Sequence, residues 1–293
     1  MAKARRILKR VKAVRSIHQV TRTMQMVASA RFRKAHARSV AARPYTDRLV
    51  SLVADLIDRS QGKLSHPLME ESPTLKRDVL LVITSNSGLC GAFNSAVLEV
   101  AMDRTVQLQT AGYELNLHVV GKRGLQYMQS RRYVVERSHT DLGYLPDYTR
   151  VTGLADQIVG DFLAGRISGL EVAYMQFVSA GRQRPVVAPL LPMSAVAPPA
   201  RPPMLRVVVP YDMLPSPQAV LDRLLPLTLR LRLYQCFLDS AVAEQMARMA
   251  AMQSASDNAE DMIHELTVLY NRMRQTQITT ELSEIMGGAE GLE

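Results

Sequence analysis

The segment ITSNSGLCGAFN, residues 83–94, contains residue types that could bind a ligand or catalyse a reaction. An apolar strand runs into a short turn in which Gly88 and Gly91 flank a single cysteine, Cys90. Free backbone N–H groups in such a turn, ahead of a helix, can bind phosphate. A thiolate at the same position can act as a nucleophile. The segment therefore raises two hypotheses, a phosphate-binding loop and a thiol active site.

The rest of the sequence supports neither hypothesis. The loop lacks the GxGxxG and GxxxxGK[ST] patterns and has no Lys or Arg to neutralise a phosphate. The six histidines form no recognisable catalytic arrangement with Cys90, and the other cysteine, Cys236, lies in no metal-binding or disulfide spacing. We interpret the two glycines as residues for tight backbone geometry and Cys90 as a small packing residue. We therefore expect no catalytic residue, no cofactor and no metal.

Long helices are predicted at both ends of the chain. In residues 1–60 the only proline is Pro44, predicted to bend or divide the helix, and in residues 211–293 Pro226 is predicted to kink it and Gly287 with Gly288 to end it. Steps of three and four between apolar residues indicate one buried seam on each helix. The first seam is Ile7, Val11, Val14, Ile17, Val20, Met24 and Val27. The second is Leu224, Leu227, Leu231, Tyr234, Leu238 and Ala241, continued by Met246, Met249, Ala259, Met262, Leu266, Leu269 and Met273.

An α/β domain is predicted between these helices, over residues 78–210, after a linker at 61–77. Apolar runs bounded by turn residues predict strands at 78–84, 113–120, 133–136 and 170–178, and an edge strand at 204–209 after a proline-rich loop that begins at Pro189. Helices are predicted at 94–111, 125–130 and 152–164. Alternation of strand and helix favours a mainly parallel sheet. The fold class is α/β, a long antiparallel coiled coil of the terminal helices with an inserted α/β domain.

The charge is distributed unevenly along the chain. The net charge is +9, but residues 1–43 carry thirteen Lys or Arg and no acid, and residues 240–293 carry nine acidic and three basic residues. Opposite charges beside two apolar seams favour pairing of the terminal helices. The alternative is a basic coiled coil that binds nucleic acid. The basic residues surround the first helix instead of lining one face, and no known nucleic-acid-reading motif follows.

Membrane insertion is not predicted from hydropathy. No apolar run approaches the roughly 20 residues needed to cross a bilayer, and the basic first segment lacks the apolar core of a signal peptide. We expect a soluble or peripheral protein.

Two terminal segments carry a family resemblance. The segments IHQVTRTMQMVASARFRKAHARSVAARPYTDRL (17–49) and MARMAAMQSASDNAEDMIHELTVLYNRMRQTQITTELSEIMGGAEGL (246–292) closely resemble the first and last helices of the gamma subunit of F-type ATP synthases. Between them GLCGAFN, VVGKRG and PSPQAVLDRLLP agree more loosely and in the same order.

The resemblance implies a rotor shaft and not an enzyme. In this family the terminal helices turn inside a ring of three alpha and three beta subunits, and the α/β domain lies beside the epsilon subunit and the membrane c-type ring. Catalysis belongs to the beta subunits. Rotation biases each beta subunit in turn, which is population shift by differential contact. The resemblance implies no nucleic-acid partner and a peripheral position on the cytoplasmic face of a bacterial inner membrane.

The resemblance also assigns roles to individual residues. It implies rotor contacts with beta subunits at Met24, Cys90, Arg274, Gln275, Thr279 and Glu281. It implies an apolar bearing at the tip of the last helix, formed by Ile285, Met286 and Leu292. One departure stands out in residues 85–92, which we call the glycine loop. Most members have an Asp-Arg pair in this loop, and this chain has Asn86-Ser87.

Overall fold

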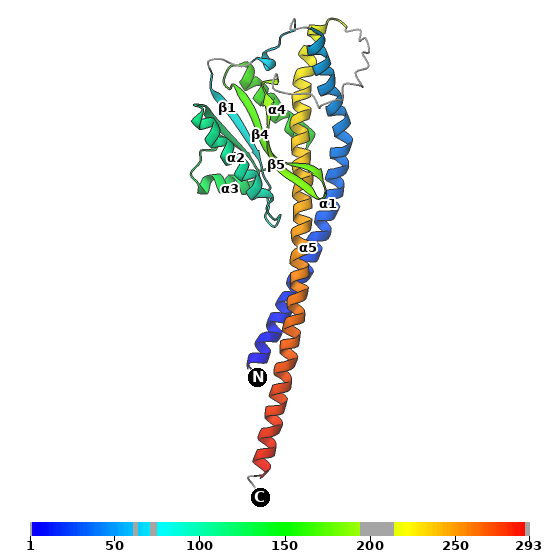
Figure 1. Cartoon of the computed structure of the whole chain (residues 1–293), viewed down its shortest axis with the longest axis vertical. Helices are drawn as coiled ribbons and strands as arrows, with labels where there is room; N and C mark the ends of the chain where they lie inside the picture. The colour runs from blue at the N-terminus through cyan, green and yellow to red at the C-terminus, as the bar shows by residue number, and fades with distance from the viewer. Residues whose placement is uncertain (1, 61–63, 71–74, 194–213, 291–293) are drawn as a thin grey trace. The chain divides into compact units, whose positions relative to one another are not determined.

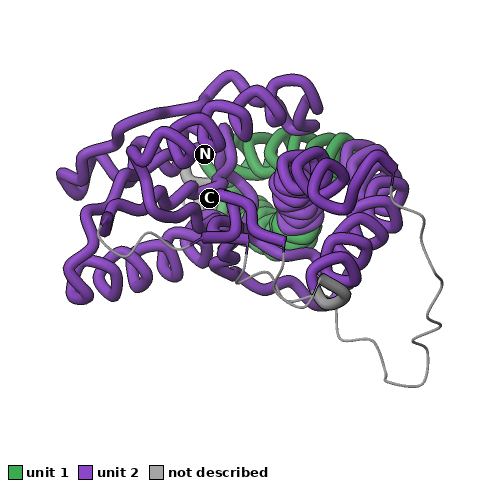
Figure 2. Tube along the Cα trace, turned by 90° about the horizontal axis from the view of Figure 1, so that it is seen from above, with its two compact units in different colours: residues 1–29, 248–293 green, residues 30–247 purple. Residues whose placement is uncertain are grey.

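The computed structural model describes residues 2–60, 64–70, 75–193 and 214–290. The chain forms two compact units, one from residues 1–29 and 248–293 and one from residues 30–247 (Figure 2). The first helix, α1 (Ala2–Ser60), and the last, α5 (Pro217–Glu290), each contribute to both units. We call residues 30–247 the sheet unit and the other the helical unit, and describe each by itself.

A five-stranded sheet lies at the centre of the sheet unit, in the order β3-β2-β1-β4-β5 (Figure 1). The first four strands in this order pair in parallel, and β5 pairs antiparallel with β4. The strands are β1 (Arg77–Ile83), β2 (Glu114–Val120), β3 (Arg137–His139), β4 (Gly169–Ser179) and β5 (Arg182–Leu191). The predicted mainly parallel sheet is confirmed.

Helices cover both faces of the sheet. They are α2 (Phe93–Thr110), α3 (Lys122–Ser130) and α4 (Tyr148–Leu163), with a short 3-10 helix η1 (Pro67–Met69). Because side chains alternate along β1, Val79 and Leu81 pack with α4 and the first turns of α5, and Leu80 and Val82 pack with α2 and α3. Burial on both faces explains why β1 reads as a continuous apolar run.

Two strand predictions differ from the structure. The short strand predicted at 133–136 is wrong by four positions, because the chain is still turning at Arg132 (φ 61°) and β3 begins only at Arg137, opposite His118 of β2. Strand β5 was not predicted, and its last residues, from Pro189 on, were assigned to a loop. On an edge strand a proline removes no ladder hydrogen bond from a second neighbour. The strand predicted at 204–209 lies outside the described residues.

The helix-breaking residues have less effect than predicted. Pro44 lies inside α1 and Pro226 inside α5, and neither divides its helix. Gly287 and Gly288 do not end α5, which continues to Glu290. Glycine in a helix costs about 1 kcal/mol relative to alanine, and that cost alone does not create a helix end.

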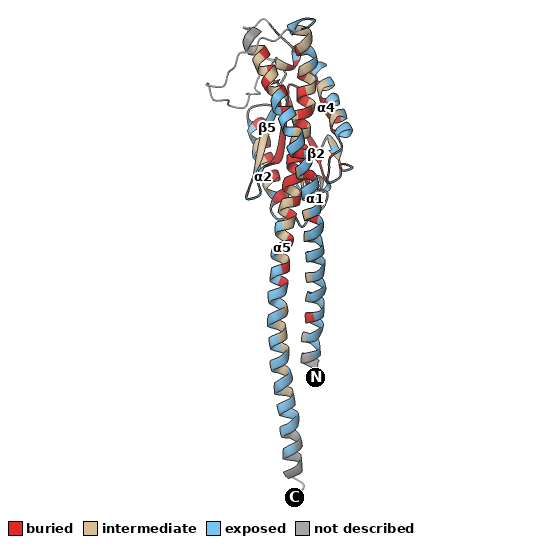
Figure 3. Ribbon diagram, turned by 90° about the vertical axis from the view of Figure 1, so that its right-hand side faces the viewer, coloured by how far each residue is buried: buried red, intermediate tan, exposed pale blue. Residues whose placement is uncertain are grey.

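In the helical unit, the early part of α1 and the late part of α5 run side by side in opposite directions (Figure 1). The Gln25 side-chain amide donates a hydrogen bond to the Gln253 side-chain carbonyl across the pair. The end of α5 continues beyond the start of α1, and most of its described residues are exposed (Figure 3). The predicted antiparallel pairing is confirmed.

The buried stripe of α1 differs from the predicted seam after Val14. The structure buries or half-buries residues in strict steps of three and four, and Ile17, Val20, Met24 and Val27 are exposed instead. The predicted seam passes through Ile17, and the observed stripe passes through His18. This difference of one residue turns the seam by about 100° around the helix. Small residues allow closer helix contact than large ones, so the buried stripe is not the most apolar one. It consists of Val11, Val14, His18, Thr21, Gln25, Ala28, Phe32, Ala35, Ser39, Ala42, Thr46, Leu49, Val53 and Leu56.

The predicted seam of α5 is correct in its first part and drifts later. Leu231, Leu238 and Ala241 are buried in the sheet unit. In the helical unit Ala259 is buried, but Met262 and Leu269 are exposed.

Candidate functional site

The glycine loop begins where β1 and β2 end together. The Thr84 backbone N–H and hydroxyl both donate to the Val120 carbonyl, at 2.9 and 2.6 Å, and the Gly124 N–H donates to the Thr84 hydroxyl at 3.0 Å. Gly121 has a φ of 93°, and a Cβ there would lie 2.4 Å from the Thr84 carbonyl oxygen. Only glycine therefore fits where the chain enters α3.

Cys90 is a packing residue of this loop. It is 2% exposed, and the Asn94 side-chain amide donates to its sulfur at 3.2 Å. The side-chain oxygen of Asn94 also accepts from the Ser85 backbone N–H at 3.0 Å. The thiol and Asn94 therefore hold the turn closed together. With its side chain inside the domain, Cys90 does not present a surface contact, which corrects the role that the resemblance implies. Leu89 is the large apolar residue that this turn exposes, at 62%.

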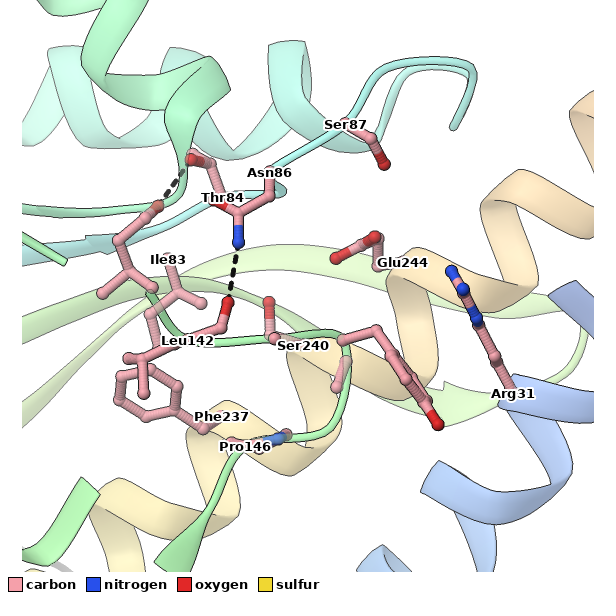
Figure 4. A pocket seen from close by; sticks show the side chains of 14 residues that line it. Arg31, Ile83, Thr84, Asn86, Ser87, Leu142, Pro146, Phe237, Ser240 and Glu244 are labelled. Atoms are coloured by element: carbon pink, nitrogen blue, oxygen red, sulfur yellow. Dashed lines mark hydrogen bonds between the residues drawn. The ribbon is translucent and has the colours of Figure 1, made fainter. Parts of the chain in front are cut away.

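Asn86 holds together three segments around the loop. Its side-chain NH2 donates to the Leu142 carbonyl at 2.7 Å (Figure 4). Its side-chain oxygen accepts from the Lys122 N–H at 3.0 Å. An aspartate has no donor for the Leu142 carbonyl. The amide that replaces the usual acid therefore has a structural role of its own, which the sequence did not reveal.

A cavity of about 230 Å³ lies beside Asn86, at the carboxyl ends of β1 and β2 (Figure 4). Arg31 and Tyr144 line it, with the guanidinium 4.6 Å from the ring centroid. Ligands of open α/β sheets bind at this edge. Here Phe237, Ser240 and Glu244 of α5 line the same space, so the cavity lies between this edge of the sheet and α5.

The residues with implied rotor contacts in the helical unit are exposed. On α1, Met24 is 40% exposed and stands in one stripe with Ile17, Val20 and Val27. Large apolar residues at steps of three and four on a solvent face indicate an interaction surface.

The late part of α5 carries the implied polar contacts. All four residues are exposed, and their hydrogen bonds are local to the helix. The Thr279 hydroxyl donates to the Gln275 carbonyl at 3.0 Å, and the Gln277 amide donates to Glu281 at 2.9 Å. The four residues are Arg274, Gln275, Thr279 and Glu281.

The tip of α5 shows an apolar stripe that sequence reasoning missed. Ile278, Leu282 and Met286 are exposed at steps of four, and Met286 reaches 68%. The spacing was visible in the sequence, but only Met286 was assigned to the bearing. The side chain of Ile285 and the whole of Leu292 lie outside the described part of the structure.

The described residues form neither a metal-binding cluster nor a membrane-spanning helix. They contain no group of three or more His, Cys, Asp or Glu side chains arranged to hold a metal ion. No described helix has a stretch that is both long and apolar enough to cross a bilayer.

Fold and surface together define a class: proteins whose two long terminal helices pair and carry an inserted, mainly parallel α/β domain. The family model described as ATP synthase matches residues 3–292. The chain is 36% identical over 296 residues to the ATP synthase gamma chain of Rhodopirellula baltica, covering 100% of both. It is 38% identical over 288 residues to that of Frankia casuarinae, covering 97% of this chain and 96% of the relative. The chain therefore belongs to the ATP synthase gamma chain family, which confirms the predicted resemblance.

Solved structures agree with this fold. The central stalk with c-ring of the Tetrahymena thermophila mitochondrial ATP synthase matches with a TM-score of 0.60 and 23% identity, over 81% of this chain and 99% of that one. The rotor of the Euglena gracilis mitochondrial ATP synthase matches with a TM-score of 0.61 and 17% identity, over 94% and 99%. The nucleic-acid alternative finds no support, since both ends and the centre match one family.

Proposed function

We propose that this chain is the central rotor shaft of an F-type ATP synthase. It transmits rotation of a membrane ion-translocating ring to the catalytic subunits and is not itself catalytic. The observation that carries the proposal is the match to curated gamma chains over the complete chain, at 36% identity. Rotation drives catalysis only if the shaft contacts the conformers of a catalytic subunit unequally. This chain meets that requirement, because its exposed residues differ along its length. They include an apolar stripe on α1, and polar and then apolar residues towards the end of α5.

The first contact surface in this proposal is the exposed stripe of α1. Ile17, Val20, Met24 and Val27 together offer an apolar strip, with Met24 facing the acidic lever of a beta subunit. Leu89 of the glycine loop contacts the lower end of a beta subunit in place of the buried Cys90. Apolar contacts suit a moving interface, because they have no fixed donor–acceptor geometry to break at each step.

The second contact surface is the late part of α5. Arg274, Gln275, Thr279 and Glu281 hydrogen-bond to a catch loop of a beta subunit. Beyond them Ile285, Met286 and Leu292 turn in an apolar bearing, to which the stripe of Ile278 and Leu282 adds area. Helical residues that are exposed all round are typical of a helix that needs a partner.

The proposed partners are three alpha and three beta subunits, an epsilon subunit and a membrane c-type ring. Catalysis takes place in the beta subunits. The complex lies on the cytoplasmic face of a bacterial inner membrane. This chain is peripheral to the membrane and is held there through the complex. The parts of the rotor in this proposal are the first helix α1 (Ala2–Ser60), an inserted α/β domain that begins with β1 at Arg77, and the last helix α5 (Pro217–Glu290).

Reconstitution tests the proposal directly. The purified full chain is mixed with cognate alpha and beta subunits, and ATP hydrolysis and rotation of a bead on the chain are recorded. We expect a stable complex whose bead turns in three steps per revolution. Cognate subunits that hydrolyse ATP equally well with and without the chain, with no rotation, would refute the assignment.

A further inference from the structure

A second and larger cavity, of about 550 Å³, lies in the sheet unit away from the glycine loop. Parts of α1, β4, β5 and α5 line it. Three guanidinium groups reach it from three different elements, Arg43 on α1, Arg184 on β5 and Arg232 on α5. Two carboxylates, Asp47 and Asp239, line the same cavity.

One of these arginines already has its counter-charge. Arg43 Nη2 lies 3.2 Å from both carboxylate oxygens of Asp239. Ser39 and Gln235 also donate to that carboxylate, at 2.9 and 2.8 Å. Asp239 is therefore saturated, and its charge is matched by Arg43. Asp47 is exposed and gives little to the interior of the cavity.

Arg232 has no such partner. Its Nη1 is shielded from solvent and makes no hydrogen bond within the described part of the chain. Burial lowers the pKa of this guanidinium, and its near neighbours Cys236 and Tyr174 are uncharged, since burial raises the pKa of the thiol to about 12 and that of the phenol further still. A guanidinium nitrogen that is shielded from water without an acceptor costs free energy that a bound anion recovers.

Arg184 is placed to complete the site. Its Nε donates to the Gln176 side chain at 2.8 Å, across the β4–β5 pair, and this bond orients the guanidinium on the face that the cavity covers. Arg184 is exposed and Arg232 is half-buried. Arginine forks fit the oxygen atoms of phosphate two at a time.

We propose that this cavity binds a phosphate group, free or carried by a small metabolite, between Arg232 and Arg184. Neither the family relationship nor the rotor role assigns a ligand to this place. The cavity is larger than one phosphate ion, so ordered water or the remainder of a phosphate ester fills the rest. A bound anion would tie β5 to α5 within the sheet unit.

Thermal unfolding of the full chain tests the site. Inorganic phosphate and glycerol phosphate are titrated separately at constant ionic strength, and the unfolding midpoint and heat of binding are measured. We expect the midpoint to rise with ligand concentration as binding to the folded state requires. Comparing the two probes distinguishes a site for the free ion from one for an ester.

Variants decide whether Arg232 is responsible. Arg232→Met keeps the volume and removes the charge, and we expect the phosphate-dependent rise to disappear. The matched control is Arg230→Met on the same helix, because Arg230 pairs with Asp156 at 2.6 Å and does not line the cavity. It should respond to phosphate as the parent chain does. An equal rise in the Arg232→Met variant would overturn the proposal, as would a parent chain that shows no rise.

A second variant keeps the test decisive if Arg232→Met does not fold. Arg184→Met changes an exposed residue, and we expect about tenfold weaker phosphate binding, because one charge-assisted contact is lost. Unchanged affinity in this variant overturns the two-arginine site.

Discussion

Single residues of the glycine loop act through hydrogen bonds inside the protein. Asn86 uses both ends of its amide, and the Cys90 sulfur accepts a hydrogen bond from Asn94. Residues that looked catalytic in the sequence are thus part of the support of a turn. Their substitution affects stability before it affects function.

Replacement of Cys90 tests this reading at the residue scale. We expect Cys90→Ser to lower the free energy of unfolding by about 1 kcal/mol, because a buried thiol is exchanged for a more polar hydroxyl that still accepts from Asn94. The ratio of rotation to ATP hydrolysis should be unchanged. Denaturant unfolding and single-molecule rotation measure the two quantities. A variant of normal stability with lost activity would restore the thiol to a functional role.

His118 gives the sheet unit a pH-dependent stability. It is 1% exposed, and its pKa is lowered from 6.5 to about 4, first by burial and then by the charges of Arg137 and His139. The neutral form is favoured in the fold, so its full contribution is present above pH 6.5 and is lost as the pH falls towards 4. At 1.36 kcal/mol per pKa unit the loss is on the order of 3 kcal/mol.

Urea unfolding between pH 7.5 and pH 4.5 measures this loss. The variant His118→Gln cannot titrate and should flatten the acid side of the stability profile. His264→Gln, at an exposed position of α5, is the control and should keep the parent profile. If the His118→Gln and parent profiles run parallel, the acid sensitivity arises elsewhere.

Met24 is the residue on which the rotor proposal is most sharply tested. Met24→Lys places a charge in the exposed apolar stripe, and the family resemblance implies an acidic lever opposite. A new ion pair of about 1 kcal/mol would slow a step of each turn by about fivefold. Rotation rate at saturating ATP is the measurement. Met26→Lys changes an exposed methionine outside the stripe and should rotate at nearly the parent rate.

At the scale of elements, α1 carries two stripes, one that is buried and one that is exposed. The sequence pattern alone did not distinguish them. Small and polar residues such as Thr21 and Ala28 are buried in α1, and larger apolar ones such as Val20 and Val27 are exposed. The most apolar stripe of this part of α1 is thus the exposed one. A hydrophobic pattern by itself does not say which stripe faces the partner helix.

Removal of the end of α5 tests the second contact surface. Truncation after Leu269 deletes the polar contacts and the tip, and it leaves the sheet unit untouched, since that unit ends at Ala247. We expect the subunit complex to assemble and rotate with reduced torque, measured from bead speed against viscous load. Full torque in the truncated chain would contradict the role given to the tip.

Edge strands show why part of the sheet was hard to predict. The buried strands β1, β2 and β4 were found from their apolar runs. Strand β5 contains two prolines and is recognisable only through its pairing with β4, for example Pro189 with Glu171. Strand β3 has three residues and depends on β2 for its place. Short edge strands are set by their neighbours and not by their own sequence.

For the molecule as a whole, the proposed function depends on contact surfaces spread along the chain. The family relationship spans residues 3–292, so the proposed role concerns the whole chain. The implied contact residues are spread along α1, the glycine loop and α5. A site of this kind has no cluster of perturbed side chains by which sequence or structure alone could find it.

The sequence by itself determined the family, the helical ends, the parallel core of the sheet and the absence of a recognisable catalytic motif in the glycine loop. These follow from local periodicity and from long matching segments, which the chain carries without reference to its fold. Only the tertiary structure decided that Cys90 is enclosed, that Asn86 joins three segments, that Met24 lies outside the helix seam and that Arg232 Nη1 is shielded from solvent without a hydrogen-bond partner among the described residues. The reason is physical, because burial and partnership depend on residues brought together from distant parts of the chain.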